Sequence, residues 1–273
     1  MAAESKETAT ATLLASFGAR RSRRSLFKGA LATGVALTGA SVLPALHGRA
    51  AGPEEDEAED SAHTIFTIAR TAERLAITLY TNGVANADTL RTQGLELDQL
   101  HQLKAALIEE QIHELFFAAN GGDVLTSTFS FPDGPATFTN LALFIKAQQQ
   151  LEGAFDSAFI AAVEEFALMG RADLARIACQ IAMIESEHRA LGRDIADLDP
   201  ADNWAFAPKL VEAVGDAPAV LQAAGYLSPR PGNSFTYQQA DFNSPSLHPI
   251  YQTIMYKEPF AAPEDGEDGE KTS

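Results

Sequence analysis

Apolar residues recur every three to four positions in four long segments of the chain, which is the spacing of one face of an α-helix. Glycine or proline follows each segment and marks its end. At a rise of about 1.5 Å per residue, each segment would span roughly 33 Å or more. The pattern predicts four amphipathic helices, over residues 62–83, 97–120, 140–169 and 172–198.

The connections between these segments predict the topology. Short joins follow the first and third helices, so each of these helices forms an antiparallel hairpin with the next one. Residues 121–138 are numerous enough to cross the length of a helix when extended. Two hairpins joined by one long crossover are an established form of four-helix bundle. Since no segment has a strand-like pattern of comparable strength, we expect an all-α fold with its bundle over residues 62–198.

The character of the chain changes after Pro200. Nine of the thirteen prolines lie between Pro200 and Pro263, and proline interrupts helices. We therefore expect residues 199–263 to form an irregular, proline-rich extension that covers the bundle, with one short helix over 209–224. Residues 264–273 are polar and are expected to be a disordered tail.

Charge is distributed unevenly along the chain. The formal net charge is −17, although residues 1–51 carry seven basic and two acidic side chains. The rest of the chain is therefore strongly acidic. Affinity for phosphate backbones depends on Lys and Arg, so nucleic-acid binding is not expected. Six acidic residues within 54–60 repel one another, which predicts a solvated linker over 52–61. A hydrophobic content of 46% excludes disorder throughout.

The basic N-terminal segment has the organisation of an export signal. Residues 20–28 carry five Arg and Lys residues, four of them in two Arg-Arg doublets, and the weakly apolar stretch 29–46 follows. This order predicts a signal peptide over residues 1–51. Residues 22–28 resemble the twin-arginine motif, with Leu26 and Phe27 in swapped order. The resemblance implies export of the folded protein by the twin-arginine machinery to the periplasm or the extracellular space.

A stable membrane anchor is not expected from the same segment. The stretch 29–46 is long enough to span a bilayer, but it contains three glycines and is only weakly hydrophobic. The cleavage position stays open, although Gly48 and Ala50 offer a site with small residues.

Acidic and histidine residues interrupt the apolar face of every predicted helix. Glu73 and Glu152 continue the apolar faces of the first and third helices. The second and fourth helices each carry a Glu-x-x-His pair, whose two members lie on one helix face because they are three residues apart. The six residues that we expect to point inward are Glu73, Glu110, His113, Glu152, Glu185 and His188.

Four inward carboxylates need compensation. An isolated ionised carboxylate in an apolar core is strongly unfavourable unless it is paired, and no Lys or Arg lies on the inner faces near these residues. Two divalent cations would balance four carboxylates and two neutral imidazoles. This donor set suits iron or manganese, although ligand preference also admits zinc. The pattern therefore predicts that all six residues bind metal.

Other polar residues receive different interpretations. Tyr80 lies seven residues after Glu73 on the same helix face, either as a packed core tyrosine or as a redox-active neighbour of the metals. Two acids beside the predicted ligands, Glu109 and Glu114, fall off the inner faces and are expected to be solvated. The single cysteine, Cys179, excludes an internal disulfide and is expected to be a packed thiol. Histidines without matching partners are His63, His101 and His248.

The arrangement of the six residues resembles a known superfamily. Each hairpin contributes a lone Glu followed, 37 or 33 residues later, by a Glu-x-x-His pair. On this constellation, residues 62–198 resemble the ferritin-like superfamily. The Phe- and Pro-rich segments 129–133 and 204–208 resemble the secreted ferritin-like family that includes desiccation-related proteins. The resemblance implies that Glu110 and Glu185 bridge two metals.

The resemblance also implies the remaining ligands and a choice of functions. Glu73 with His113 would complete one coordination sphere, and Glu152 with His188 the other. A pair of iron ions would serve to oxidise ferrous iron or remove peroxide in stress protection, and a pair of manganese ions would serve a catalase-like reaction. A non-catalytic, desiccation-related protein with a structural or vestigial site is the alternative, since one fold hosts many functions. Bundles of this kind often form homo-oligomers.

Overall fold

The computed structural model describes residues 53–201 and 205–256. The predicted signal peptide and the predicted C-terminal tail therefore lie outside the described residues. The elements, in chain order, are α3 (Pro53–Ala85), α4 (Ala87–Arg91), α5 (Leu97–Ala119), β1 (Thr128–Phe129), η1 (Gly134–Phe138), α6 (Leu141–Leu168), α7 (Ala172–Ile195), η2 (Val214–Asp216), α8 (Ala217–Ala223), β2 (Phe235–Thr236) and α9 (His248–Tyr256).

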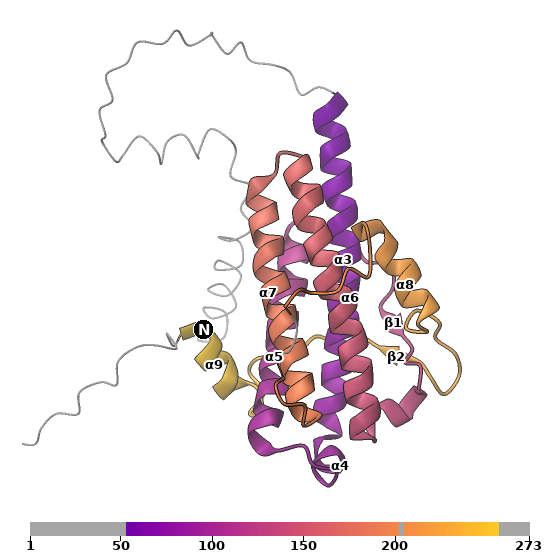
Figure 1. Cartoon of the computed structure of the whole chain (residues 1–273), viewed down its shortest axis with the longest axis vertical. Coiled ribbons are helices and arrows are strands. Elements are labelled where there is room, and N and C mark those ends of the chain that lie inside the picture. The colour runs from indigo at the N-terminus through magenta and orange to yellow at the C-terminus, as the bar shows by residue number, and fades with distance from the viewer. Residues whose placement is uncertain (1–52, 202–204, 257–273) are drawn as a thin grey trace, which may run out of the picture.

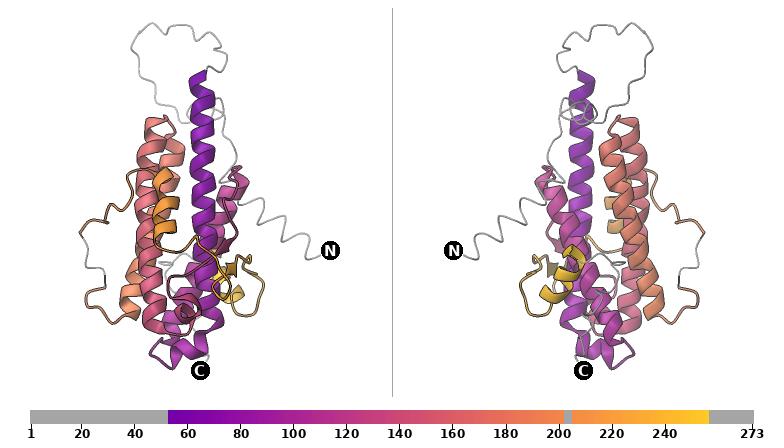
Figure 2. Two further views of the ribbon diagram at one scale, coloured as in Figure 1. Left: turned by 90° about the vertical axis from the view of Figure 1, so that its right-hand side faces the viewer. Right: turned by 90° about the vertical axis from the view of Figure 1, so that its left-hand side faces the viewer.

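Four long helices, α3, α5, α6 and α7, run along the long axis of the molecule (Figure 1). The closest packing is within two antiparallel pairs, α3 with α5 and α6 with α7. Figure 2 shows these pairs as two layers side by side, joined by the crossover that leads from α5 to α6. The predicted all-α bundle is confirmed. Within the described residues, no helix is long and apolar enough to cross a membrane.

The helix ends follow the local sequence. The side chain of Asn140 accepts a hydrogen bond from the backbone nitrogen of Leu143, which caps the start of α6. Gly170 ends α6 with a φ of 70°, a left-handed conformation that suits glycine. As a result, α5, α6 and α7 end within three residues of their predicted bounds.

The first helix is longer than predicted. It begins at Pro53 instead of Ala62, so the acidic run that was expected to be a linker is helical. Proline at a first helical position and acidic residues in the first turns both favour a helix start, because of the fixed φ of proline and the positive end of the helix dipole. These local preferences favour the helix over the mutual repulsion of the acids.

The C-terminal extension covers two sides of the bundle. Its helix α8 packs on α6, and α9 packs on α5. The predicted short helix over 209–224 is shorter in the structure, where η2 and α8 occupy residues 214–223. The extension is joined to the crossover by an antiparallel pairing of β2 with β1, in which Phe235 lies opposite Phe129. Both the backbone nitrogen and the carbonyl of Phe131 are hydrogen-bonded to the side chain of Asn233.

Two expectations about exposure are wrong. Glu114 is 2% exposed instead of solvated, because the Nε atoms of Arg70 and Arg74 each donate to its Oε1 at 2.9 Å. Both arginines come from α3, three residues before and one residue after Glu73. Cys179 is exposed on α7 instead of packed, because it lies just past Ala178 and outside the buried face of that helix.

A tight contact between α3 and α6, near the end of α3, gives a test of the packing. A Cβ atom added to Gly83 would lie 2.4 Å from a ring carbon of the fully buried Phe144. We expect Gly83→Ala to lower the free energy of unfolding by about 1–3 kcal/mol, although alanine is the better helix former by about 1 kcal/mol. Denaturant unfolding measures this loss.

The matched control is Gly215→Ala, because no heavy atom lies within 4 Å of a Cβ at that position. If the two alanine variants unfold at the same denaturant concentration, the close contact between α3 and α6 is refuted.

Candidate metal centre

All six predicted metal ligands lie together in the interior of the bundle. Glu73 comes from α3, Glu110 and His113 from α5, Glu152 from α6, and Glu185 and His188 from α7. The four carboxylates are at most 1% exposed and His188 is 3% exposed. The side chain of His113, at 13%, is the most accessible of the six.

The six side chains form two overlapping clusters. One consists of Glu73, Glu110, His113 and Glu185, and the other of Glu110, Glu152, Glu185 and His188. Within each cluster, one ligand atom from every residue lies within 4.8 Å of the others. Glu110 and Glu185 belong to both clusters, which is the position that a carboxylate bridging two cations would occupy.

The distances inside each cluster fit a coordinated cation. The Nδ1 atom of His113 lies 3.7–3.8 Å from carboxylate oxygens of Glu73, Glu110 and Glu185. The Nδ1 atom of His188 lies 3.0 Å from Glu110 and 3.7 Å from Glu152 and Glu185. Ligand atoms that surround a cation at bond lengths of about 2.0–2.2 Å are separated from one another by distances of this size.

Unsatisfied polar atoms support the same interpretation. Nine buried oxygen and nitrogen atoms of the six residues have no hydrogen-bond partner. Buried polar atoms without partners are costly and rare in proteins, and buried carboxylates are more costly still. Cations at the two clusters would satisfy all nine atoms. The residues present therefore fit a site that could hold metal ions.

Burial and mutual repulsion perturb the protonation of the site. Burial, followed by the nearby charge of Glu110, raises the pKa of Glu73 well above its usual range. Burial, followed by the charges of Glu110 and Glu152, raises the pKa of Glu185 in the same way. Without metal, the site therefore retains protons that bound cations would displace.

Tyr80 is a direct neighbour of the cluster. It is fully buried, its hydroxyl donates a hydrogen bond to Oε1 of Glu152, and its ring lies edge-on to the imidazole of His188 at 5.9 Å. Gln148 donates hydrogen bonds to the Tyr80 hydroxyl and to the backbone carbonyl of His188. Burial and the Glu152 carboxylate raise the pKa of Tyr80, so the phenol keeps its proton.

Glu109 is a functional neighbour that sequence reasoning missed. Its Oε2 lies 3.0 Å from Nε2 of His188, and its side chain is 29% exposed instead of fully solvated. A carboxylate on the outer nitrogen of a histidine fixes the ring so that the other nitrogen faces the metal. In α7 the equivalent position before Glu185 is Ile184, which cannot accept such a bond. The two halves of the site are therefore inequivalent.

This inequivalence predicts the effect of one substitution. Glu109→Gln removes the charged acceptor from His188, so we expect the affinity for one of two metal ions to fall about 10–100-fold. Competition with a chelator of known affinity measures this change. The control is Glu187→Gln, an exposed acid on α7. Equal metal affinities for the two variants would exclude a positioning role for Glu109.

The raised pKa values predict a pH dependence for the metal-free protein. Where a folded carboxyl has a raised pKa, the folded state binds more protons than the unfolded chain, so stability falls as pH rises above the unfolded value of about 4.3. At pH 7, metal-free Glu73→Gln should be at least about 1 kcal/mol more stable than the metal-free wild type. The difference should shrink toward pH 4, and denaturant unfolding across this range measures it. A variant less stable at pH 7 would contradict the expectation.

Comparison with known families agrees with the fold. A family model described as a ferritin-like domain matches residues 61–197, which is half of the chain and includes all six clustered residues. Neither the curated proteins nor the solved structures gave a significant match. The match covers the bundle from residue 61 of α3 to the end of α7. The chain therefore belongs to the ferritin-like domain family.

Proposed function

We propose that this protein is an exported dinuclear metal protein, with two iron ions, that oxidises ferrous iron or removes peroxide in stress protection. The observation that carries the proposal is the pair of clusters that share Glu110 and Glu185 and leave nine buried ligand atoms without partners. Glu73 with His113 would complete one coordination sphere, and Glu152 with His188 the other. When bound, iron supplies the electrons that reduce oxygen or peroxide.

The surrounding residues suit this chemistry. The four carboxylates are buried away from bulk water, so charges at the centre interact more strongly than they would in water. Tyr80 holds a proton against Glu152, and this contact supports a role for Tyr80 as a redox-active or proton-donating neighbour. Glu109 and His113 reach the partly exposed edge of the site and offer a polar route for ions and protons.

The same site is compatible with another metal and with another function. Carboxylate and imidazole ligands can also bind manganese, and a di-manganese centre would support a catalase-like reaction. A metal that only holds the bundle together would make the protein a non-catalytic, desiccation-related one. The overlap of the clusters supports all of these, so the experiment has to separate metal content from turnover.

We propose the twin-arginine route for export, to the periplasm or the extracellular space. Support comes from the Arg-rich motif at residues 20–28, outside the described residues. A protein exported in its folded form can be loaded with metal before export. The twin-arginine export machinery would then be a partner of this protein, and a homo-oligomer is compatible with the same function.

The decisive experiment compares metal content and turnover. Elemental mass spectrometry on the protein from its native host should find about two iron or manganese atoms per chain. Glu110→Ala with Glu185→Ala should abolish binding and leave a helical bundle by circular dichroism, because both shared ligands are lost. The control is Glu164→Ala with Glu187→Ala, which removes two exposed acids. Stoichiometric metal in the first double variant would refute the site.

The same preparations separate the functions. Anaerobic loading with ferrous iron, followed by oxygen or hydrogen peroxide, should consume the oxidant in the wild type and in the control variant. A wild type that holds metal but consumes neither oxidant would establish the non-catalytic alternative.

A further inference from the structure

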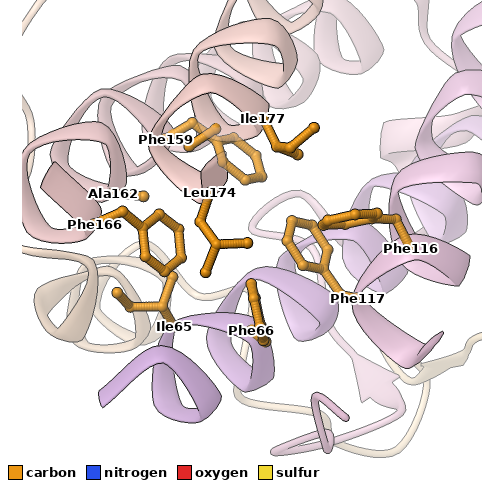
Figure 3. Close-up of a pocket in the computed structure, with 10 residues that line it drawn as sticks. Ile65, Phe66, Phe116, Phe117, Phe159, Ala162, Phe166, Leu174 and Ile177 are labelled. Carbon is orange, nitrogen blue, oxygen red and sulfur yellow. The ribbon is translucent and has the colours of Figure 1, made fainter. Parts of the chain in front are cut away.

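The interior of the bundle differs in polarity on the two sides of the ligand cluster. On one side, Phe66 lies seven residues before Glu73 on α3, and Phe159 lies seven residues after Glu152 on α6. Both rings line a small pocket in the core, and Figure 3 shows that the side chains around them are apolar. This end of the core therefore offers no hydrogen-bond partner to the ligands.

The other side of the cluster is polar. Tyr80 lies seven residues after Glu73, and Gln148 lies four residues before Glu152. Because α3 and α6 run in opposite directions, both residues lie on the same side of the ligands, away from the pocket of Figure 3. Gln148 and Tyr80 are fully buried. A buried amide is costly unless its groups are hydrogen-bonded, so the contacts of Gln148 show what it does there.

The contacts of Gln148 fix the orientation of its amide. Its Nε2 lies 2.6 Å from the backbone carbonyl oxygen of His188. A carbonyl only accepts hydrogen bonds, so the amide nitrogen has to face it. On the other side, Oε1 of Gln148 accepts a hydrogen bond from Nε2 of Gln149 at 2.7 Å, and that nitrogen also donates to the carbonyl of Arg189 at 2.8 Å. Two carbonyls of α7 thus hold the amide in one orientation.

Gly192 of α7 provides the space for these amides. A Cβ atom added there would overlap Oε1 of Gln148 and would lie 2.5 Å from Nε2 of Gln149. Glycine in a helix interior costs about 1 kcal/mol relative to alanine. Its presence inside α7 therefore has a packing reason, which is the approach of the two glutamines to the carbonyls of that helix.

The fixed amide determines the direction of the Tyr80 hydroxyl hydrogen. The second N–H of the Gln148 amide points at the Tyr80 hydroxyl oxygen, 3.3 Å from Nε2. An amide nitrogen cannot accept a hydrogen bond, so the hydroxyl accepts from Gln148 and donates its own hydrogen to Oε1 of Glu152. The hydrogen bonds therefore run in one direction, from Gln148 through Tyr80 to Glu152.

This hydrogen bond distinguishes the two oxygens of Glu152. Oε1 is occupied by Tyr80, and Oε2 is buried without a hydrogen-bond partner among the described residues. In the other three carboxylates of the cluster, both oxygens are buried without such a partner. Glu152 alone among the four carboxylates thus has one oxygen engaged and one oxygen available to a cation.

We propose that Gln148 is a positioning residue of the metal centre, which turns the Tyr80 hydroxyl toward Glu152 so that Glu152 presents Oε2 to a bound cation. The part that concerns the cation rests on the proposed function. The orientation of Tyr80 does not, because the amide, the hydroxyl and the carboxylate make their contacts without metal.

NMR on the metal-free protein tests the orientation of Tyr80. The Cζ signals of carbon-13 labelled tyrosines respond to hydrogen bonding of the hydroxyl, and Tyr80→Phe identifies the signal of Tyr80 by its loss. Gln148→Met keeps an unbranched side chain of similar length and removes both N–H donors, so it should shift this signal. An unshifted Tyr80 signal in Gln148→Met would overturn the proposal.

The matched control is Gln150→Met. Gln150 is an exposed glutamine of the same helix, and its Oε1 accepts a hydrogen bond from the hydroxyl of Tyr226 at 2.8 Å. This substitution should shift the signal of Tyr226 and leave that of Tyr80 in place. If Gln148→Met fails to fold, Gly192→Ala replaces it, because it displaces the amide of Gln148 and should shift the same Tyr80 signal.

Metal affinity tests whether Gln148 acts through Tyr80. Loss of an outer partner of a ligand typically lowers metal affinity 10–100-fold, so Gln148→Met should weaken the binding of one of two ions by about 10-fold. In a Tyr80→Phe background the same substitution should have little further effect, because the hydroxyl through which it acts is already absent. Chelator competition measures both losses, and Gln150→Met should cause neither.

The outcomes separate this proposal from the proposed function. Equal losses of affinity in the two backgrounds would mean that Gln148 acts through the His188 backbone or through packing, and would overturn its role toward Tyr80. A wild type that binds no metal would refute the proposed function and the presentation of Oε2 with it, even if the Tyr80 signal shifts as expected. Metal binding by the wild type, combined with an unshifted Tyr80 signal in Gln148→Met, would refute the role of Gln148 alone.

Discussion

The burial of four carboxylates and two imidazoles without a basic partner is the constraint on which the rest of the structure depends. The protein neutralises its other buried acids itself, Glu114 with Arg70 and Arg74, and Asp156 with Arg189. At the centre it supplies no such cation, and nine ligand atoms remain unpaired. The long helices, the apolar residues around the site and the C-terminal cover hold these groups together. The repulsion among the carboxylates has a free-energy cost, and only a bound cation offsets it.

The repeat in the sequence conceals an asymmetry in the structure. Each hairpin contributes the same three ligands, yet the neighbours of the two half-sites differ. Glu109 contacts His188, and Tyr80 contacts Glu152, so both polar neighbours serve one half. The other half contains His113, whose edge is the most accessible among the ligands. The ligands of the two half-sites are related by a two-fold repeat, but the half-sites differ in solvent exposure and in hydrogen bonding.

Periodicity predicted the helices and the six inward residues, because both depend only on the position of a residue around its own helix. It failed where a partner comes from another helix. Glu114 lies off the inner face of α5, but Arg70 and Arg74 of α3 bury it. Glu109 meets His188 across the α5–α7 interface. The start of α3 was missed because linker and helix-start signals coincide in one acidic run.

The exposure of Cys179 has a practical consequence for spectroscopy. It is the only cysteine of the chain, and it projects from the outer surface of α7, the helix that supplies Glu185 and His188. Six residues separate it from Glu185, a distance of about 9 Å along the helix axis. A nitroxide or fluorophore attached there would sit at one defined point, close enough for a paramagnetic ion in the centre to broaden or quench its signal. The native sequence thus carries its own reporter position.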